Sequence, residues 1–181
     1  MTRIKILERG EMNEEQGRVY DEAKASGGPV GGPYIAYIRH PAYMRLMQDA
    51  RNCLSGGPLS ARERQIAHLA IARHWGAKYP WFAQARASLD AGVEQEIIDA
   101  INARRDPGLG DPRERAALEV AKELLADHGM SDATYATAEA SLGLDDLVAL
   151  VATVGQFSMT CCTTNAFDVS PPDDAPTPLA E

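Results

Sequence analysis

The chain has 181 residues and a formal charge of −8, from 18 Lys and Arg against 26 Asp and Glu. This length corresponds to one domain, which can bury a sufficient core without disulfide bonds or metal ions. The acidic balance argues against nucleic acids and anionic membranes as partners, since both attract clustered positive charge.

Several classes of protein are not expected from the sequence. No run of about 18 apolar residues is present, so we predict no transmembrane helix. Residues 1–20 mix both signs of charge without an apolar segment, which is unlike a secretory signal. The three cysteines, Cys53, Cys161 and Cys162, are odd in number and have no metal-site spacing. We therefore predict a cytoplasmic protein without a disulfide framework, a metal or a cofactor.

The composition predicts an all-α fold. Alanine, the strongest helix former, occurs 29 times, whereas the β-branched residues Val and Ile occur 8 and 9 times. The nearest approach to a strand is the short alternation of Ile4–Leu7. Helices are expected at about 13–26, 34–39, 42–54, 60–75, 80–91, 93–104, 111–128, 131–142 and 144–167.

Capping residues set several of these boundaries. Asn13 and Ser131 are typical N-caps, and Ser60 with Glu63 three residues later forms a capping box. Gly76 is placed to end the helix that Ser60 begins. The segment GGPVGGP at 27–33 interrupts the helices with turns, and no Lys-Ser or Lys-Thr follows it as a phosphate loop requires.

The chain divides into three parts by composition. Residues 1–29 form an N-terminal helical arm, and residues 30–168 form a single helical domain. Residues 169–181 are rich in proline and acidic residues and contain little that could pack. We expect this tail to be disordered or draped over a partner subunit.

Few residues could carry chemistry. His68 lies among apolar neighbours on the helix from 60 to 75, with Gln65 three residues before it on the same face. Its imidazole is either a packed core residue or a buried group that moves protons near neutrality. Trp81 is either core or a ligand platform. The late polar cluster MTCCTTNAF at 159–167 either bonds the helix backbone or lines a cavity.

The segment 59–101, LSARERQIAHLAIARHWGAKYPWFAQARASLDAGVEQEIIDAI, resembles the carboxymuconolactone decarboxylase family. This family belongs to the alkylhydroperoxidase D-like superfamily, and the similarity extends over about 30–170. The resemblance implies an all-α, alkylhydroperoxidase D-like helical bundle that assembles as a homo-oligomer, either a trimer or a hexamer.

The resemblance also locates the family's reactive positions. Redox members of the superfamily use a Glu, a CxxC and a His, and these positions correspond here to Gln65, Ala77, Pro80 and Gln84. A thiol relay needs a sulfur nucleophile and a base to ionise it. Both are replaced, so thiol peroxidase activity of the usual kind is not expected.

A closer branch of the family has no CxxC and usually reads Y-E-W-x-x-H. At this point the chain reads Tyr79-Pro80-Trp81-Phe82-Ala83-Gln84. The carboxylate and the imidazole of the branch are therefore absent, and His68 stands where the branch usually has an aliphatic residue.

Two hypotheses follow. The first is a cofactor-free acid–base enzyme, a decarboxylase, other lyase or isomerase acting on a small lactone or carboxylic acid, with His68 as the proton carrier. Its substrate-binding residues would be Gln65, Gln84, Tyr79, Trp81, Cys161 and Thr164. The second is a family member that has lost catalysis and binds a small molecule or serves as an oligomeric scaffold.

Overall fold

The computed structural model describes residues 2–173 and 175–180, and within them the backbone forms helices and no strand. The helical bounds are η1 Arg9–Glu11, α1 Glu14–Ala25, α2 Tyr34–Tyr37, α3 Pro41–Ser55, α4 Ala61–His74, α5 Lys78–Asp90, α6 Gln95–Asn102, α7 Pro112–Asp127, α8 Asp132–Leu142 and α9 Leu144–Ala166. The all-α fold expected from the composition is confirmed, and Ile4–Leu7 is not a strand.

The predicted caps lie where the sequence places them. Asn13 accepts a hydrogen bond from the N–H of Gln16, and Ser131 accepts one from Thr134. The capping box at the start of α4 is complete, since Ser60 N–H also donates to Glu63 Oε2 at 2.9 Å. These contacts satisfy N–H groups that a helix leaves free at its first turn.

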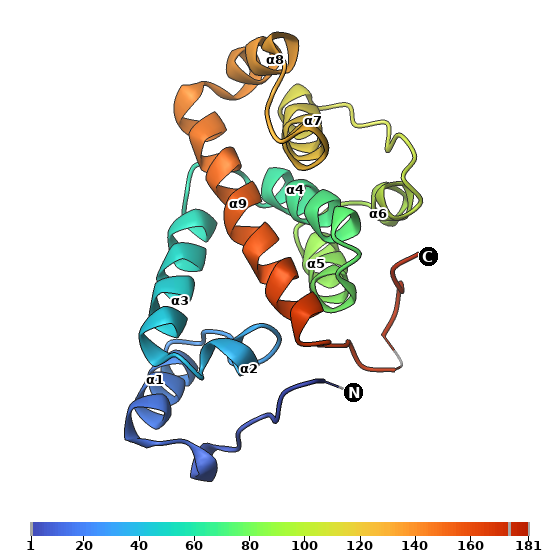
Figure 1. Ribbon diagram of the computed structural model, residues 1–181. Helices are drawn as coiled ribbons and strands as arrows, with labels where there is room; N and C mark the ends of the chain where they lie inside the picture. The colour runs from blue at the N-terminus through green and yellow to red at the C-terminus, as the bar shows by residue number, and fades with distance from the viewer. Residues whose placement is uncertain (1, 174, 181) are drawn as a thin grey trace.

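The helices α4 and α9 form the centre of the molecule. Helix α4 packs against α7, α9, α5 and α6, and α9 crosses the structure with α3 on one side and α4 and α5 on the other (Figure 1). Ile66, Leu69 and Ile71 of α4 are fully buried with Leu150 of α9. Helix α4 is therefore covered on most of its circumference, which explains why apolar residues follow one another so closely along it.

A second, smaller core joins the N-terminal helices. Val19 and Ala23 of α1 pack with Tyr34 of α2 and with Met44 and Met47 of α3. Residues of the predicted arm 1–29 thus share a core with residues beyond 30. Helix α3 in turn contacts α9, which connects this smaller cluster to the main body.

Helix α9 is long and apolar, with 23 residues and a mean hydropathy of 1.4 over its most apolar window. By length and composition alone it could cross a membrane, and a buried core helix meets the same criteria. Here it packs against five other helices, α3, α4, α5, α7 and α8. One of its faces remains exposed, with Leu144, Val148, Val151 and Met159 along it.

The sequence predicts a C-terminal tail that is disordered or draped over a partner subunit, and the described residues of the tail contact the helical domain of the same chain. Trp81 Nε1 donates to the carbonyl of Thr177, and Asn102 bonds the backbone of both Pro178 and Ala180, each at 2.9 Å. Leu179 packs against the main core. The backbone hydrogen bonds supply contacts that a Pro-rich composition does not predict. Asp174 and Glu181 of the predicted tail lie outside the described residues.

Candidate functional site

His68 lies where three helices meet. It projects from α4 and its Nδ1 is 3.2 Å from Oε1 of Gln84 on α5. Its ring stacks on Phe157 of α9, with ring centroids 4.1 Å apart and an interplanar angle of 30°. An amide oxygen only accepts, so this pairing places the imidazole proton on Nδ1 and leaves the lone pair on Nε2.

The surroundings keep this imidazole neutral. Burial, followed by the positive field of Arg64, lowers the pKa of His68 from 6.5 to about 3, and the hydrogen bond to Gln84 opposes this only in part. Desolvation and a like charge both disfavour the imidazolium ion. The sequence-based hypothesis of a group that titrates near neutrality therefore needs correction. At pH 7 His68 is a base or a hydrogen-bonding group, and it is not an acid.

Two arginines that sequence reasoning missed act on this imidazole. Arg64 lies one helical turn before His68, is half-buried and donates to the carbonyl of Leu59 at 3.2 Å. Arg51 is exposed on α3, and its field contributes to lowering the pKa of both His68 and Arg64. The spacing of Arg64 four residues before His68 could have identified it. Arg51 is distant in sequence and gives no such signal.

Gln65 presents an unpartnered acceptor beside this group. Its Oε1 is buried and has no hydrogen-bond partner within the described part of the chain. A buried polar atom left without a partner costs about 1–3 kcal/mol, so such atoms usually meet a ligand or a water molecule. Gln65 is three residues from His68, on the same face of α4. His68 and Gln84 therefore meet between α4 and α5, and Gln65 shares a face of α4 with His68.

The other predicted substrate-binding residues are held by other contacts. Tyr79 lies against the glycine loop, where a Cβ on Gly32 would clash with its ring, and burial raises its pKa. Trp81 is fully buried in the main core, with its indole N–H bonded to Thr177. Both thus make structural contacts.

The threonines of the polar cluster on α9 bond the backbone of their own helix, whereas Asn165 donates to the carbonyl of Trp75 at 2.7 Å. Thr164 is buried, and its hydroxyl donates to the carbonyls of Thr160 and Cys161 at 3.2 and 3.0 Å. Cys161 is fully buried, and burial raises the pKa of its thiol well above the usual range. The sequence leaves two possibilities open for this cluster, bonding to the helix backbone or lining a cavity, and Thr164 bonds the helix backbone.

The positions of the superfamily's two cysteines lie at the start of α5. Ala77 and Pro80 are both buried there and offer no nucleophile. The described residues contain no group of three or more His, Cys, Asp or Glu that could hold a metal ion. The chemistry that remains at the site is that of an imidazole, two amides and two guanidinium groups.

Comparison with known proteins shows what this chain is similar to in sequence and in fold. The sequence model of the carboxymuconolactone decarboxylase family matches residues 41–123, which include His68, Gln65 and Gln84. No curated protein matches the chain significantly.

Solved structures share the fold over most of the chain. An alkylhydroperoxidase AhpD core, an uncharacterized peroxidase-related protein from Ralstonia eutropha JMP134, superposes with a TM-score of 0.76 at 18% identity, covering 96% of this chain and 93% of that one. An uncharacterized peroxidase-related protein from Silicibacter sp. TM1040 gives the same TM-score and coverage at 17% identity. A protein of unknown function from Agrobacterium tumefaciens gives a TM-score of 0.71 at 16% identity, over 77% of this chain and 97% of that one.

Proposed function

Because residues 41–123 belong to the carboxymuconolactone decarboxylase family and the chain has the alkylhydroperoxidase D-like fold, we propose that it is a cofactor-free acid–base enzyme. Its substrate is a small lactone or carboxylic acid, and His68 is its base. The observation that carries this proposal is the 3.2 Å contact between His68 Nδ1 and Gln84, which leaves Nε2 free to accept a proton.

The resting charge state favours a reaction that begins with proton removal. Neutral His68 takes a proton from the carbon next to the substrate carbonyl, and the electron pair of that bond moves toward the carbonyl oxygen. The amide N–H of Gln65 is suited to donate to the enolate oxygen as charge develops there. Return of the proton to another carbon completes an isomerisation. In a decarboxylation, loss of carbon dioxide forms the enolate, and the carbon then takes up a proton from solvent, because resting His68 carries no proton on Nε2.

The two arginines explain how so weak a base could become useful. A substrate carboxylate bound by Arg64 and Arg51 would offset the positive field that lowers the pKa of His68. The pKa of His68 would then rise only when substrate is bound, by the part that the arginines lower, while burial, the largest cause, would still hold it below 6.5. Thiol peroxidase chemistry has no comparable support, since Ala77 and Pro80 occupy the two cysteine positions.

The proposal is tested by hydrogen–deuterium exchange at the carbon next to the carbonyl, followed by NMR in D2O with a panel of lactones and carboxylic acids. His68→Ala should lower the exchange rate by about 10²-fold or more, the usual size of a general-base contribution. His128→Asn is the matched control, since it removes a histidine outside the site. His128 ends α7 in a left-handed conformation, which asparagine also tolerates. Exchange at the wild-type rate in His68→Ala would exclude His68 as the base.

A second possible function, binding of a small molecule without catalysis, is favoured by the stacking of His68 on Phe157. A buried imidazole stacked at 4.1 Å with a pKa of about 3 is also what a binding pocket without turnover would contain. In that case members of the panel bind, as measured by calorimetry, while no exchange above the uncatalysed rate occurs.

A further inference from the structure

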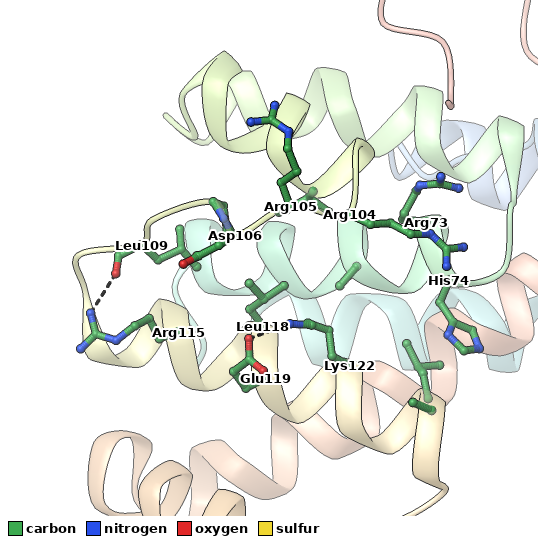
Figure 2. A pocket seen from close by; sticks show the side chains of 15 residues that line it. Arg73, His74, Arg104, Arg105, Asp106, Leu109, Arg115, Leu118, Glu119 and Lys122 are labelled. Atoms are coloured by element: carbon green, nitrogen blue, oxygen red, sulfur yellow. Dashed lines mark hydrogen bonds and ion pairs between the residues drawn. The ribbon is translucent and has the colours of Figure 1, made fainter. Parts of the chain in front are cut away.

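A cavity lies on a different side of α4 from His68. It has a volume of about 630 Å³ and is bounded by the end of α4, the loop between α6 and α7, and α7 itself (Figure 2). Ala70, Arg73 and His74 line it from α4. At about 100° per residue, these positions lie about 140–240° around the helix from His68. The cavity is therefore separate from the site described above.

The lining is strongly cationic, although the whole chain carries a charge of −8. Five cationic side chains line the cavity against two acidic ones, Asp106 and Glu119. The five are Arg73, Arg104, Arg105, Arg115 and Lys122.

The four arginines of the lining form no ion pair with an acid in the described part of the chain. Among the described residues, the only ion pair that involves the lining joins Lys122 and Glu119 at 2.9 Å. Burial and the field of Arg104 lower the pKa of Arg73, and the same two causes lower the pKa of His74. Figure 2 shows the side chains of Arg73 and Arg104 reaching the same end of the cavity, beside His74. An anion placed there would relieve this repulsion.

Two of the guanidinium groups are held in place by backbone carbonyls. Arg73 Nε donates to the carbonyl of Asn102 at 2.6 Å. Arg115 Nη1 donates to the carbonyls of Leu109 and Gly110 at 2.8 and 2.6 Å. Each group keeps further N–H donors that these bonds do not use. Pre-positioned donors lose little side-chain entropy when a ligand binds.

The backbone conformation of Arg104 is an independent reason to expect a ligand in this cavity. It follows the end of α6 with a φ of 55°, a left-handed position where glycine is the usual residue. Arginine is strained in this conformation relative to glycine. A side chain kept on a strained backbone points to a role for that side chain.

The rest of the lining is apolar and favours a ligand with an apolar body. Ile101, Leu109, Leu118 and Leu125 contribute side chains from α6, the loop and α7. The volume lies in the range that holds small organic ligands. We propose that this cavity binds an amphiphilic organic anion, with a carboxylate or phosphate head at Arg73 and Arg104 and an apolar body over the leucines.

The test compares octanoate, octyl phosphate, 1-octanol and acetate by calorimetry with the full chain. Octanoate or octyl phosphate should bind at least tenfold more tightly than 1-octanol, which lacks the charge, and than acetate, which lacks the body. The anion that binds more tightly, octanoate or octyl phosphate, identifies the preferred head group as a carboxylate or a phosphate. Equal binding of octanoate, octyl phosphate and 1-octanol, or no binding of either anion at 5 mM, would overturn the proposal.

Arg104→Gly makes the test specific, because it removes the guanidinium group and relieves the strained backbone at the same time. Anion affinity should fall by about tenfold or more, as expected for a lost charge-assisted contact, while the melting temperature stays equal or rises. Arg86→Gln, which removes an exposed charge on α5 outside the cavity, is the control and should leave affinity unchanged. Unchanged affinity in Arg104→Gly would contradict the assignment.

The location is read from backbone amide resonances. Binding in this cavity should shift the signals of Gly108 and Gly110, which lie in the loop beside the lining residues Pro107 and Leu109. The signals of Gly31 and Gly32, which lie against Tyr79, should not move. This readout does not involve turnover, so its outcome does not depend on whether the proposed acid–base function is correct. Shifts confined to Gly31 and Gly32 would place the ligand elsewhere and refute the proposal.

Discussion

His68 carries a neutral imidazole because burial and the fields of Arg64 and Arg51 act on its charged form in the same direction. The residue types alone leave a packed core histidine and a proton carrier near neutrality both open. Burial, then Arg64 of α4 and Arg51 of α3, lower the pKa, whereas Gln84 of α5 acts in the opposite direction. At the scale of single residues, the charge state of the site is thus set by long-range contacts.

This charge state makes a prediction for folding stability. The pKa of His68 is about 3 when folded and near 6.5 when unfolded. Above pH 6.5 both states are neutral, and the stabilisation is fully present. As the pH falls toward 3 the unfolded state binds a proton first, so the stabilisation is lost. Between pH 7 and pH 5 the free energy of unfolding should fall by up to about 2 kcal/mol more in wild type than in His68→Gln, measured by urea denaturation. Parallel pH profiles would contradict the buried neutral state.

At the scale of elements, partly buried ion pairs join the start of α4 to its neighbours. Arg113 of α7 is 2.6 Å from both Glu63 of α4 and Asp146 of α9, and Arg62 of α4 is 2.7 Å from Glu114 of α7. Glu63 is buried and also closes the capping box of α4. These contacts fix the register of α4, and therefore the placement of both His68 and Arg73.

Removing Arg113 tests this arrangement. Arg113→Met should lower the free energy of unfolding by about 3–5 kcal/mol, because it leaves Glu63 as a buried carboxylate without its partner. Arg45→Met, which breaks the more exposed pair with Glu22, should cost less than about 1 kcal/mol. Chemical denaturation of both variants gives the comparison. Equal losses in the two would show that burial of Glu63 contributes nothing.

At the scale of the whole molecule, the exposed apolar face of α9 is the surface where we expect a second copy of the chain. Val148 is 60% exposed and Leu144 is 54% exposed on a helix that is otherwise central to the core. A homo-oligomer, the trimer or hexamer that the family resemblance implies, stays a prediction, as does a cytoplasmic location. Burial of this face would remove a continuous apolar surface from water.

The prediction is tested by light scattering after size-exclusion chromatography. Val148→Glu should shift the protein toward the monomer, because a charge placed in the centre of the face cannot be buried without a partner. Leu89→Glu, at a 48% exposed position on α5, is the control and should leave the mass unchanged. A wild-type monomer, or an oligomer that Val148→Glu leaves intact, would show that this face is not the contact.

The sequence by itself determined the helical fold and most helix boundaries, because the signals are local. Ser60 with Glu63, and Asp111 with Pro112, act within one helical turn, so adjacent residues suffice to place α4 and α7. Helix α5 begins at Lys78 rather than near Pro80, a shift of less than one turn. His68 and Gln84 were identified individually as polar residues on two helices.

Only the tertiary structure decided what these residues do. The contact of His68 with Gln84 joins positions 16 residues apart, and its stacking on Phe157 joins α4 to α9. The cationic cavity brings Arg73 and Arg104 from two helix ends to one place, although neither belongs to a recognisable motif. Helix signals are carried by neighbours in sequence, whereas charge state, burial and cavities depend on residues that meet only when the chain is folded.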